Sequence, residues 1–266
     1  MTQAERRLYL IRSLLNEKTE YQSLNVPRDA GEQRKLLRSL MNVRMPKAAD
    51  EAFLSVQDEY LQQELADEGI TDLDNLRPVS GDIYLWQGDI TRLKCGAIVN
   101  AANSGMTGCY IPCHACIDNC IHTFAGVQLR QDCAALMAEQ GHEEPTGQAK
   151  ITKAYNLPCD YVLHTVGPIV SGRVTREDER LLASCYRSCL ELAEKNSLRS
   201  IAFCCISTGV FHFPNECAAE IAVETVRHYK VETGSKIKVV FNVFKDLDKT
   251  IYERLLGANC APAARA

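Results

Sequence analysis

The chain has 266 residues, 46% of them apolar and 24% charged, and a formal net charge of −4. This composition is typical of a folded globular protein and excludes an intrinsically disordered one. The acidic balance argues against a general nucleic-acid binder, and no apolar run approaches the ~20 residues that span a bilayer, so we expect neither nucleic acid nor membrane as a partner.

Residues 1–78 are predicted to form three amphipathic helices. Apolar side chains recur at helical spacing between residues 8 and 15, between 36 and 41, and between 53 and 65, just before Gly69. The junction with the rest of the chain is expected at the breaker-rich residues 78–81. This stretch has no basic face, and we interpret it as a helical extension that caps the next domain or shapes its substrate site.

After Gly81 the pattern changes to strands that alternate with helices. This alternation predicts a central sheet covered by helices, with ligands bound by loops at the strand ends. Strands are expected at residues 83–86, 97–99, 161–163, 201–203 and 238–241. Helices are expected near residues 118–139, 176–196, 216–230 and 248–256, and residues 261–266 are expected to be frayed.

The thirteen cysteines are unevenly placed. None precedes Cys95, yet Cys109, Cys113, Cys116 and Cys120 fall within twelve residues. The count is odd and the start of the chain has no uninterrupted apolar signal core, so we expect a cytoplasmic protein with reduced thiols rather than a disulfide scaffold. Clustered cysteines in such a protein indicate metal or redox chemistry.

Within this cluster, Cys109, His114 and Cys116 form a reasonable set of zinc ligands, since zinc takes thiolate and imidazole ligands. Adjacent residues tend to point apart, so Cys113 and His114 are not expected to bind the same ion. Three protein ligands would leave a fourth position open, as in catalytic zinc sites. The alternatives are a closed structural site that also uses Cys113 or Cys120, or simply buried thiols.

Three further segments lie where strands are expected to end. In residues 87–91, Asp89 could accept a hydrogen bond from an exocyclic amine such as that of adenine, or could cap a helical turn. Residues 100–104 offer asparagine amides to sugar hydroxyls, or form an ordinary turn. In residues 205–211, backbone N–H groups around Gly209 could bind phosphate, although no Walker motif is present, or could belong to a plain turn.

Together these segments resemble a macrodomain over residues 80–256. The ordered motifs that carry the resemblance are Gly88-Asp89-Ile90-Thr91, Asn100-Ala101-Ala102-Asn103-Ser104, Asp118-Asn119-Cys120-Ile121-His122 with Ala125-Gly126, Leu163-His164-Thr165-Val166-Gly167-Pro168, and Ile206-Ser207-Thr208-Gly209. The chain is most similar to the zinc-dependent branch of the family, which has an N-terminal helical extension and a Cys-x4-His-x-Cys loop. Here that loop is residues 109–116, and it replaces the glycine-rich loop of common macrodomains.

The resemblance implies a three-layer α/β/α macrodomain with a mixed central sheet at residues 79–266, preceded by the α-helical extension at residues 1–78. It also implies an enzyme that binds ADP-ribose and uses one zinc ion to remove mono-ADP-ribose from proteins. The roles that it implies are Asp89 for the adenine amine with Ile90 beside it; Ser207, Thr208, Gly209, Val210 and Phe211 for the diphosphate; Asn103 for the distal ribose; Asp118 as base or as orienter of the metal loop; and Cys109, His114 and Cys116 for zinc.

Two other functions would account for part of this pattern. One is a non-catalytic ADP-ribose reader with a structural zinc, and the other is a thiol redox or metal-storage protein. His122 and His164 are expected to be packed structural histidines, whereas His212 lies in a loop from which it could approach a ligand.

Overall fold

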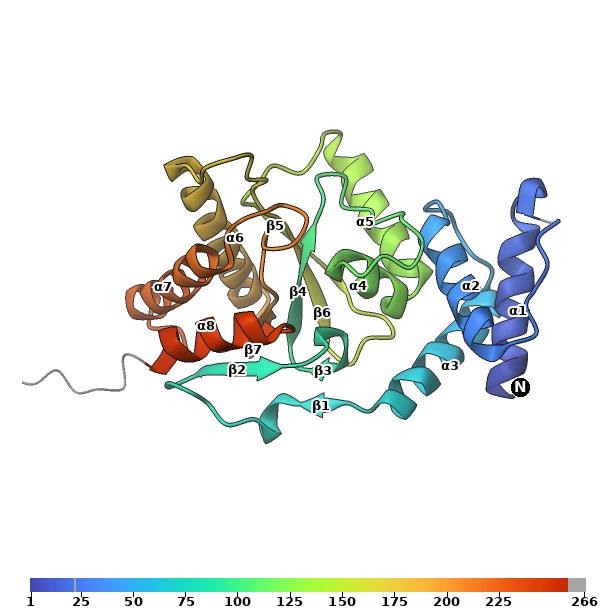
Figure 1. The fold of residues 1–266 in the computed structure, drawn as a ribbon, viewed down its shortest axis with the longest axis horizontal. Coiled ribbons are helices and arrows are strands. Elements are labelled where there is room, and N and C mark those ends of the chain that lie inside the picture. Colours follow the sequence, from blue (N-terminus) through green and yellow to red (C-terminus); the bar gives the residue numbers. More distant parts are fainter. Residues whose placement is uncertain (22, 258–266) are drawn as a thin grey trace, which may run out of the picture. The chain divides into compact units, whose positions relative to one another are not determined.

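The computed structural model describes residues 1–21 and 23–257 (Figure 1). The tail expected to be frayed, residues 261–266, lies outside these residues. The described chain divides into two compact units. The first contains Met1–Ile70, Gly105–Glu143 and Ala154–Leu157, and the second contains Thr71–Ser104, Glu144–Lys153 and the chain from Pro158 onward. The segment with the predicted metal loop therefore groups with the N-terminal helices.

The three predicted N-terminal helices are present: α1 (Gln3–Asn16), α2 (Ala30–Val43) and α3 (Glu51–Glu68). A short 3-10 helix, η1 (Thr19–Tyr21), follows α1. Each α-helix begins at a polar cap that accepts a hydrogen bond from the first turn, as the sequence chemistry favours. Their apolar faces form one buried cluster together with Val127 from later in the chain. The members from the three helices are Leu10, Ile11, Leu14, Leu15, Leu37, Leu40, Met41, Phe53, Tyr60 and Leu61.

The stretch expected to be helical near residues 118–139 is helical, and it is divided into α4 (Ile117–Ala125) and α5 (Val127–Gln140). Gly126 separates them with φ = 101°, a conformation that side chains other than glycine rarely adopt. Gln57 of α3 occupies the space beside this glycine, and its Oε1 accepts a hydrogen bond from the N–H of Val127 at 2.9 Å. A side chain from the N-terminal helices therefore caps the start of α5.

The second unit contains a six-stranded sheet with the order β2-β8-β7-β4-β6-β5. Its strands are β2 (Ile83–Gln87), β4 (Ala97–Ala102), β5 (Ala149–Lys153), β6 (Tyr161–Val166), β7 (Ser200–Phe203) and β8 (Lys238–Val243). All neighbours pair in parallel except β5, which is antiparallel to β6, so the sheet is mixed as expected. The five predicted strands are confirmed, and β5 is an additional edge strand.

Helices α6 (Arg176–Lys195), α7 (Asn215–Thr233) and α8 (Asp246–Gly257) pack side by side in this unit (Figure 1). Helix α6 also contacts β5, β6 and β7, and α8 contacts β2 and β8. Two short strands, β1 (Thr71–Asp72) and β3 (Leu93–Lys94), pair in parallel. The 3-10 helix η2 (Leu73–Asn75) directly follows β1, and η3 (Ile90–Arg92) directly precedes β3. None of the described helices has the length and apolar character that a bilayer span requires.

Candidate functional site

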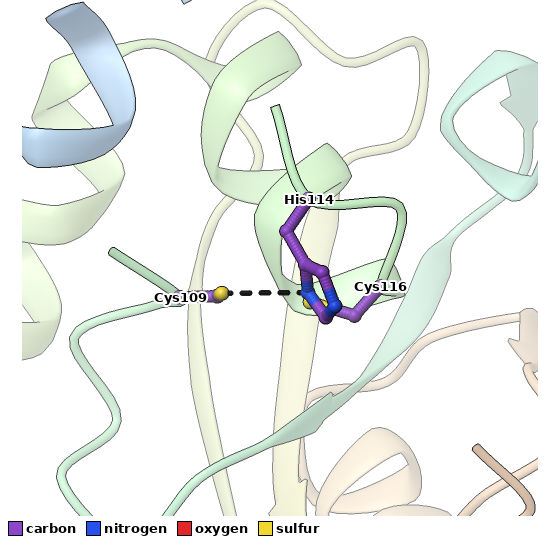
Figure 2. A group of neighbouring side chains, drawn as sticks. All are labelled: Cys109, His114 and Cys116. Carbon is purple, nitrogen blue, oxygen red and sulfur yellow. Dashed lines mark hydrogen bonds between the residues drawn. The ribbon is translucent and has the colours of Figure 1, made fainter. Parts of the chain in front are cut away.

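The first unit brings Cys109, His114 and Cys116 together (Figure 2). Their ligand atoms all lie within 4.8 Å of one another, and Sγ of Cys109 is 3.6 Å from Nδ1 of His114. All three side chains are half-buried. The donor set consists of two thiols and one imidazole, which is the chemistry that zinc prefers. The three residues could thus hold a single metal ion.

The loop folds in this way because of three local features. Gly108 has φ = 84° and lies directly on the ring of His122, where a Cβ atom would approach ring carbons to 2.8 Å. The N–H of His114 bonds the carbonyl of Ile111 at 3.2 Å, which turns the chain back toward Cys109. Cys116 is the N-cap of α4, so the helix start fixes the direction of its thiol.

Electrostatics at the loop disfavour two negative charges in the absence of a cation. Burial raises the pKa of Cys116 to about 12, and the neighbouring Cys109 and Asp118 act in the same direction. Two adjacent thiolates repel each other in a partly buried site, and a bound cation removes this penalty. The arrangement is therefore one in which metal binding and thiol deprotonation are expected to occur together.

The two other thiols of the cluster face different partners. Sγ of Cys113 is exposed and lies 3.2 Å from Oγ of Ser39 on α2. Sγ of Cys120 lies 3.5 Å from Nη2 of Arg38, also on α2. Among the described residues, neither thiol belongs to the group of ligand atoms formed by the first three residues.

Asp118 and His122 form a buried pair one turn apart on α4. Oδ1 of Asp118 is 3.5 Å from Nε2 of His122, and both residues are almost fully buried. The expectation that His122 is packed is confirmed by this burial and by its contact with Gly108. Asp118 follows Cys116 by two residues, in the first turn of α4.

Sequence reasoning missed Arg38 and Asn119, which contact the metal loop. Nη2 of Arg38 donates to the carbonyl of His114 at 2.8 Å and to Oδ1 of Asn119 at 3.0 Å. Asn119 directly follows the predicted Asp118 in the same motif, and this position was the signal that could have identified it. Arg38 precedes His114 by 76 residues, and nothing in its surrounding sequence indicated this contact.

In the second unit, Asp89 is the N-cap of η3. Its Oδ1 accepts hydrogen bonds from N and Oγ1 of Thr91, at 2.9 and 2.7 Å. The capping role is thus present, and among the described residues its hydrogen bonds involve one of the two carboxylate oxygens, Oδ1. Ile90 beside it is buried.

The loop from Ser207 to Phe211 directly precedes α7. Ser207 has φ = 64°, and among the described residues its buried Oγ has no hydrogen-bond partner. In the same described chain, the N–H groups of Gly209, Val210 and Phe211 donate no hydrogen bond. The first residue of α7 follows Pro214, which provides no side-chain cap. Free N–H groups next to a helix N-terminus are suited to phosphate oxygens.

Asn103, which follows the end of β4, is half-buried. Asn100, within β4, contacts the buried His164. Nδ1 of His164 is 3.1 Å from Nδ2 of Asn100, and its Nε2 is 2.8 Å from Oγ1 of Thr152. Burial lowers the pKa of His164 to about 3, so the ring is neutral at ordinary pH. His164 is thus packed and hydrogen-bonded, as expected, whereas His212 is exposed.

The family model of the Macro domain matches residues 99–222. The chain is 61% identical over 260 residues to the protein-ADP-ribose hydrolase of Treponema medium, and the match covers 96% of this chain and 100% of the relative. It is 51% identical over 247 residues to the protein-ADP-ribose hydrolase of Staphylococcus aureus (strain MSSA476), covering 92% of each. The chain belongs to the macrodomain family.

A solved macrodomain has the same fold. The macrodomain of Trypanosoma brucei, in complex with ADP-ribose, is 33% identical with a TM-score of 0.65, and the match covers 83% of this chain and 95% of that one. The expected macrodomain fold is thus confirmed. Within this macrodomain, the metal-loop residues and Asp118 belong to the first unit, and Asp89, Asn103 and the loop 207–211 belong to the second.

Proposed function

We propose that this macrodomain is a zinc-dependent hydrolase that removes mono-ADP-ribose from modified protein side chains. The observation that carries the proposal is the convergence of the ligand atoms of Cys109, His114 and Cys116. The names of the relatives, protein-ADP-ribose hydrolases at 61% and 51% identity, support the hydrolase activity. The free thiols suit the reducing cytoplasm, where we expect the protein to act.

The proposed substrate is a protein that carries mono-ADP-ribose. Asp89 would accept a hydrogen bond from the adenine amine through the carboxylate oxygen that does not cap η3, and Ile90 would pack beside the base. The N–H groups of residues 209–211 and the Ser207 hydroxyl would bind the diphosphate. Asn103 would orient the distal ribose through its amide.

Cys109, His114 and Cys116 would hold one zinc ion. The chemistry that zinc would supply there is Lewis acidity, which stabilises the negative charge that develops as the bond to the acceptor side chain breaks. The reaction adds water across the bond between the anomeric carbon of the distal ribose and the acceptor. Asp118 would take the proton of the attacking water as a general base, or would orient the loop through its contacts on α4.

The test is metal analysis of the purified protein, coupled to release of ADP-ribose from a mono-ADP-ribosylated protein with and without a chelator. We expect zinc to co-purify at about one ion per chain and activity to be lost on chelation and restored by zinc. Activity that is indifferent to zinc removal would contradict the proposed role of the metal. Binding of ADP-ribose without turnover would indicate a reader, and absence of binding in calorimetry would favour a thiol redox or metal-storage protein.

A further inference from the structure

Arg38 of α2 donates to the metal loop from the N-terminal helices. Its Nη2 lies 2.8 Å from the carbonyl oxygen of His114 and 3.0 Å from Oδ1 of Asn119. A guanidinium is a charged donor, and hydrogen bonds from charged donors are stronger than those between neutral groups. The backbone of one proposed metal ligand is therefore held by a side chain more than seventy residues away in sequence.

Asn119 connects this arginine to the other two proposed ligands. It is fully buried, and its Nδ2 donates to the carbonyls of Ile111 and Cys109 at 2.9 and 3.3 Å. Its backbone N–H lies 3.4 Å from Sγ of Cys116. Arginine has only donors, so the amide oxygen must face Arg38 and the NH2 group must face the two carbonyls.

A second side chain of α2 strengthens this connection. Oδ1 of Asn42 accepts the N–H of Cys113 at 2.9 Å, and its Nδ2 donates to Oγ1 of Thr123 on α4 at 2.8 Å. Arg130 of α5 donates in return to the carbonyls of Met41, Asn42 and Arg44 at the end of α2, the shortest at 2.6 Å. Polar contacts thus tie the C-terminal half of α2 to both sides of the metal loop.

We propose that Arg38 and Asn119 are a positioning pair for the metal site, so that the N-terminal helices set the affinity of the loop for zinc. This inference rests on the zinc site proposed above. The pair contacts Cys109, His114 and Cys116, each through a hydrogen bond. Residues that orient metal ligands typically change metal affinity by ~10- to 100-fold when they are replaced.

The test measures zinc affinity in the full chain, by competition with a chromophoric chelator. In Arg38→Met the arginine donors are absent, and we expect the dissociation constant for zinc to rise by ~10- to 100-fold. We also expect the absorption spectrum of the Co²⁺-loaded variant to differ from that of the wild type, because the imidazole is no longer held in place. Arg38→Lys retains a cationic donor and should recover part of the affinity.

Two arginines of the same helical bundle provide matched controls. Arg34 lies one turn earlier on α2 and pairs with Glu64 at 3.5 Å, so Arg34→Met alters the same helix at an exposed site. Arg7 is buried in α1 and donates to Gln33 of α2 at 3.0 Å, so Arg7→Met loosens the bundle without touching the loop. Both variants should bind zinc as the wild type does.

Asn119→Asp provides an independent check, because it keeps an acceptor for Arg38 but loses the donors to the carbonyls of Cys109 and Ile111. It too should bind zinc more weakly. Unchanged zinc affinity in Arg38→Met, or an equal loss in Arg7→Met, would overturn the positioning role while leaving the zinc site intact. A wild-type chain that binds no zinc would instead overturn the proposed function itself.

Discussion

The thiol of Cys109 lies 3.6 Å from Nδ1 of His114, although four residues of loop separate the two positions. The turn at Ile111 and the conformation of Gly108 bring the two ligand atoms together. The local geometry of this loop thus places a thiol and an imidazole where one zinc ion could bind both.

We therefore predict that Cys116→Ser abolishes zinc binding and hydrolysis together while the protein remains folded. Serine is a good helix N-cap, so the start of α4 is preserved, whereas the thiolate ligand is lost. Zinc content and ADP-ribose release are measured in parallel. Cys113→Ser is the control: its thiol faces Ser39, so zinc content and activity should both be normal. Full activity in Cys116→Ser would show that this thiol is not a required ligand.

Asp118→Ala is predicted to lower turnover by ~10²- to 10⁴-fold, the usual contribution of general-base catalysis. The zinc content of the variant then assigns the role. If zinc remains bound, the loss is that of a base; if zinc affinity falls as well, Asp118 orients the loop through α4. Near-normal turnover with zinc bound would contradict the assignment as base.

Gly209→Ala is predicted to weaken ADP-ribose binding without a change in stability. A Cβ atom at this glycine meets no protein atom within 4 Å, so the folded chain accommodates it. A bound diphosphate would lie close to the N–H of this residue, and the methyl group would then collide with it. We expect the dissociation constant to rise at least ~10-fold, about 1.4 kcal/mol, in calorimetry.

Gly257→Ala is the matched control for that experiment, because its Cβ is equally unobstructed but it lies at the end of α8. Its ADP-ribose affinity and its thermal midpoint should equal those of the wild type. Equal affinities in Gly209→Ala and the wild type would place the diphosphate elsewhere.

Because His164 is buried, we predict that the folded protein loses stability in mild acid. Its pKa is lowered to about 3 in the folded state, below the value of about 6.5 in an unfolded chain, so the unfolded state binds more protons between these values. The contribution of this residue to stability is therefore complete above pH 6.5 and declines as the pH falls toward 3. Between pH 7 and pH 5 this residue should lower the free energy of unfolding by about 2 kcal/mol.

Urea unfolding at pH 7 and pH 5 measures this loss, and His164→Gln isolates it. Glutamine can replace the hydrogen bonds to Asn100 and Thr152 but cannot titrate. The difference in unfolding free energy between the two pH values should shrink by about the same 2 kcal/mol in the variant. An unchanged pH dependence would mean that the pKa of His164 is the same in the folded and unfolded states.

Much of the fold could be predicted from the sequence, because most of its elements bury a continuous apolar face. Helices such as α2 and strands such as β7 carry the periodic apolar residues that the core requires. The edge strand β5 was missed because its residues are mostly half-exposed and alternate with polar side chains over only five positions. The break at Gly126 was missed because a glycine alone does not distinguish a kink from a helix end.

The convergence of Cys109, His114 and Cys116 could be predicted, because short-range spacing determines their geometry. A loop with four residues between Cys109 and His114, and a helix cap at Cys116, suffice to bring the atoms together. Arg38 was not predictable in the same way. Its role depends on how α2 packs beside α4, and no local pattern in the sequence encodes a contact between helices so far apart along the chain.

The hydrogen bond from Val127 to Gln57 also bears on protein engineering. The metal-loop segment, residues 105–143, depends on α2 and α3 for partners to its backbone groups at His114, Cys113 and Val127. If that segment alone were grafted into another scaffold, these backbone groups would lose their hydrogen-bond partners. Each lost partner would lower the stability of the grafted protein. The loop therefore cannot be transferred alone, and a design that uses it must also include α2 and α3.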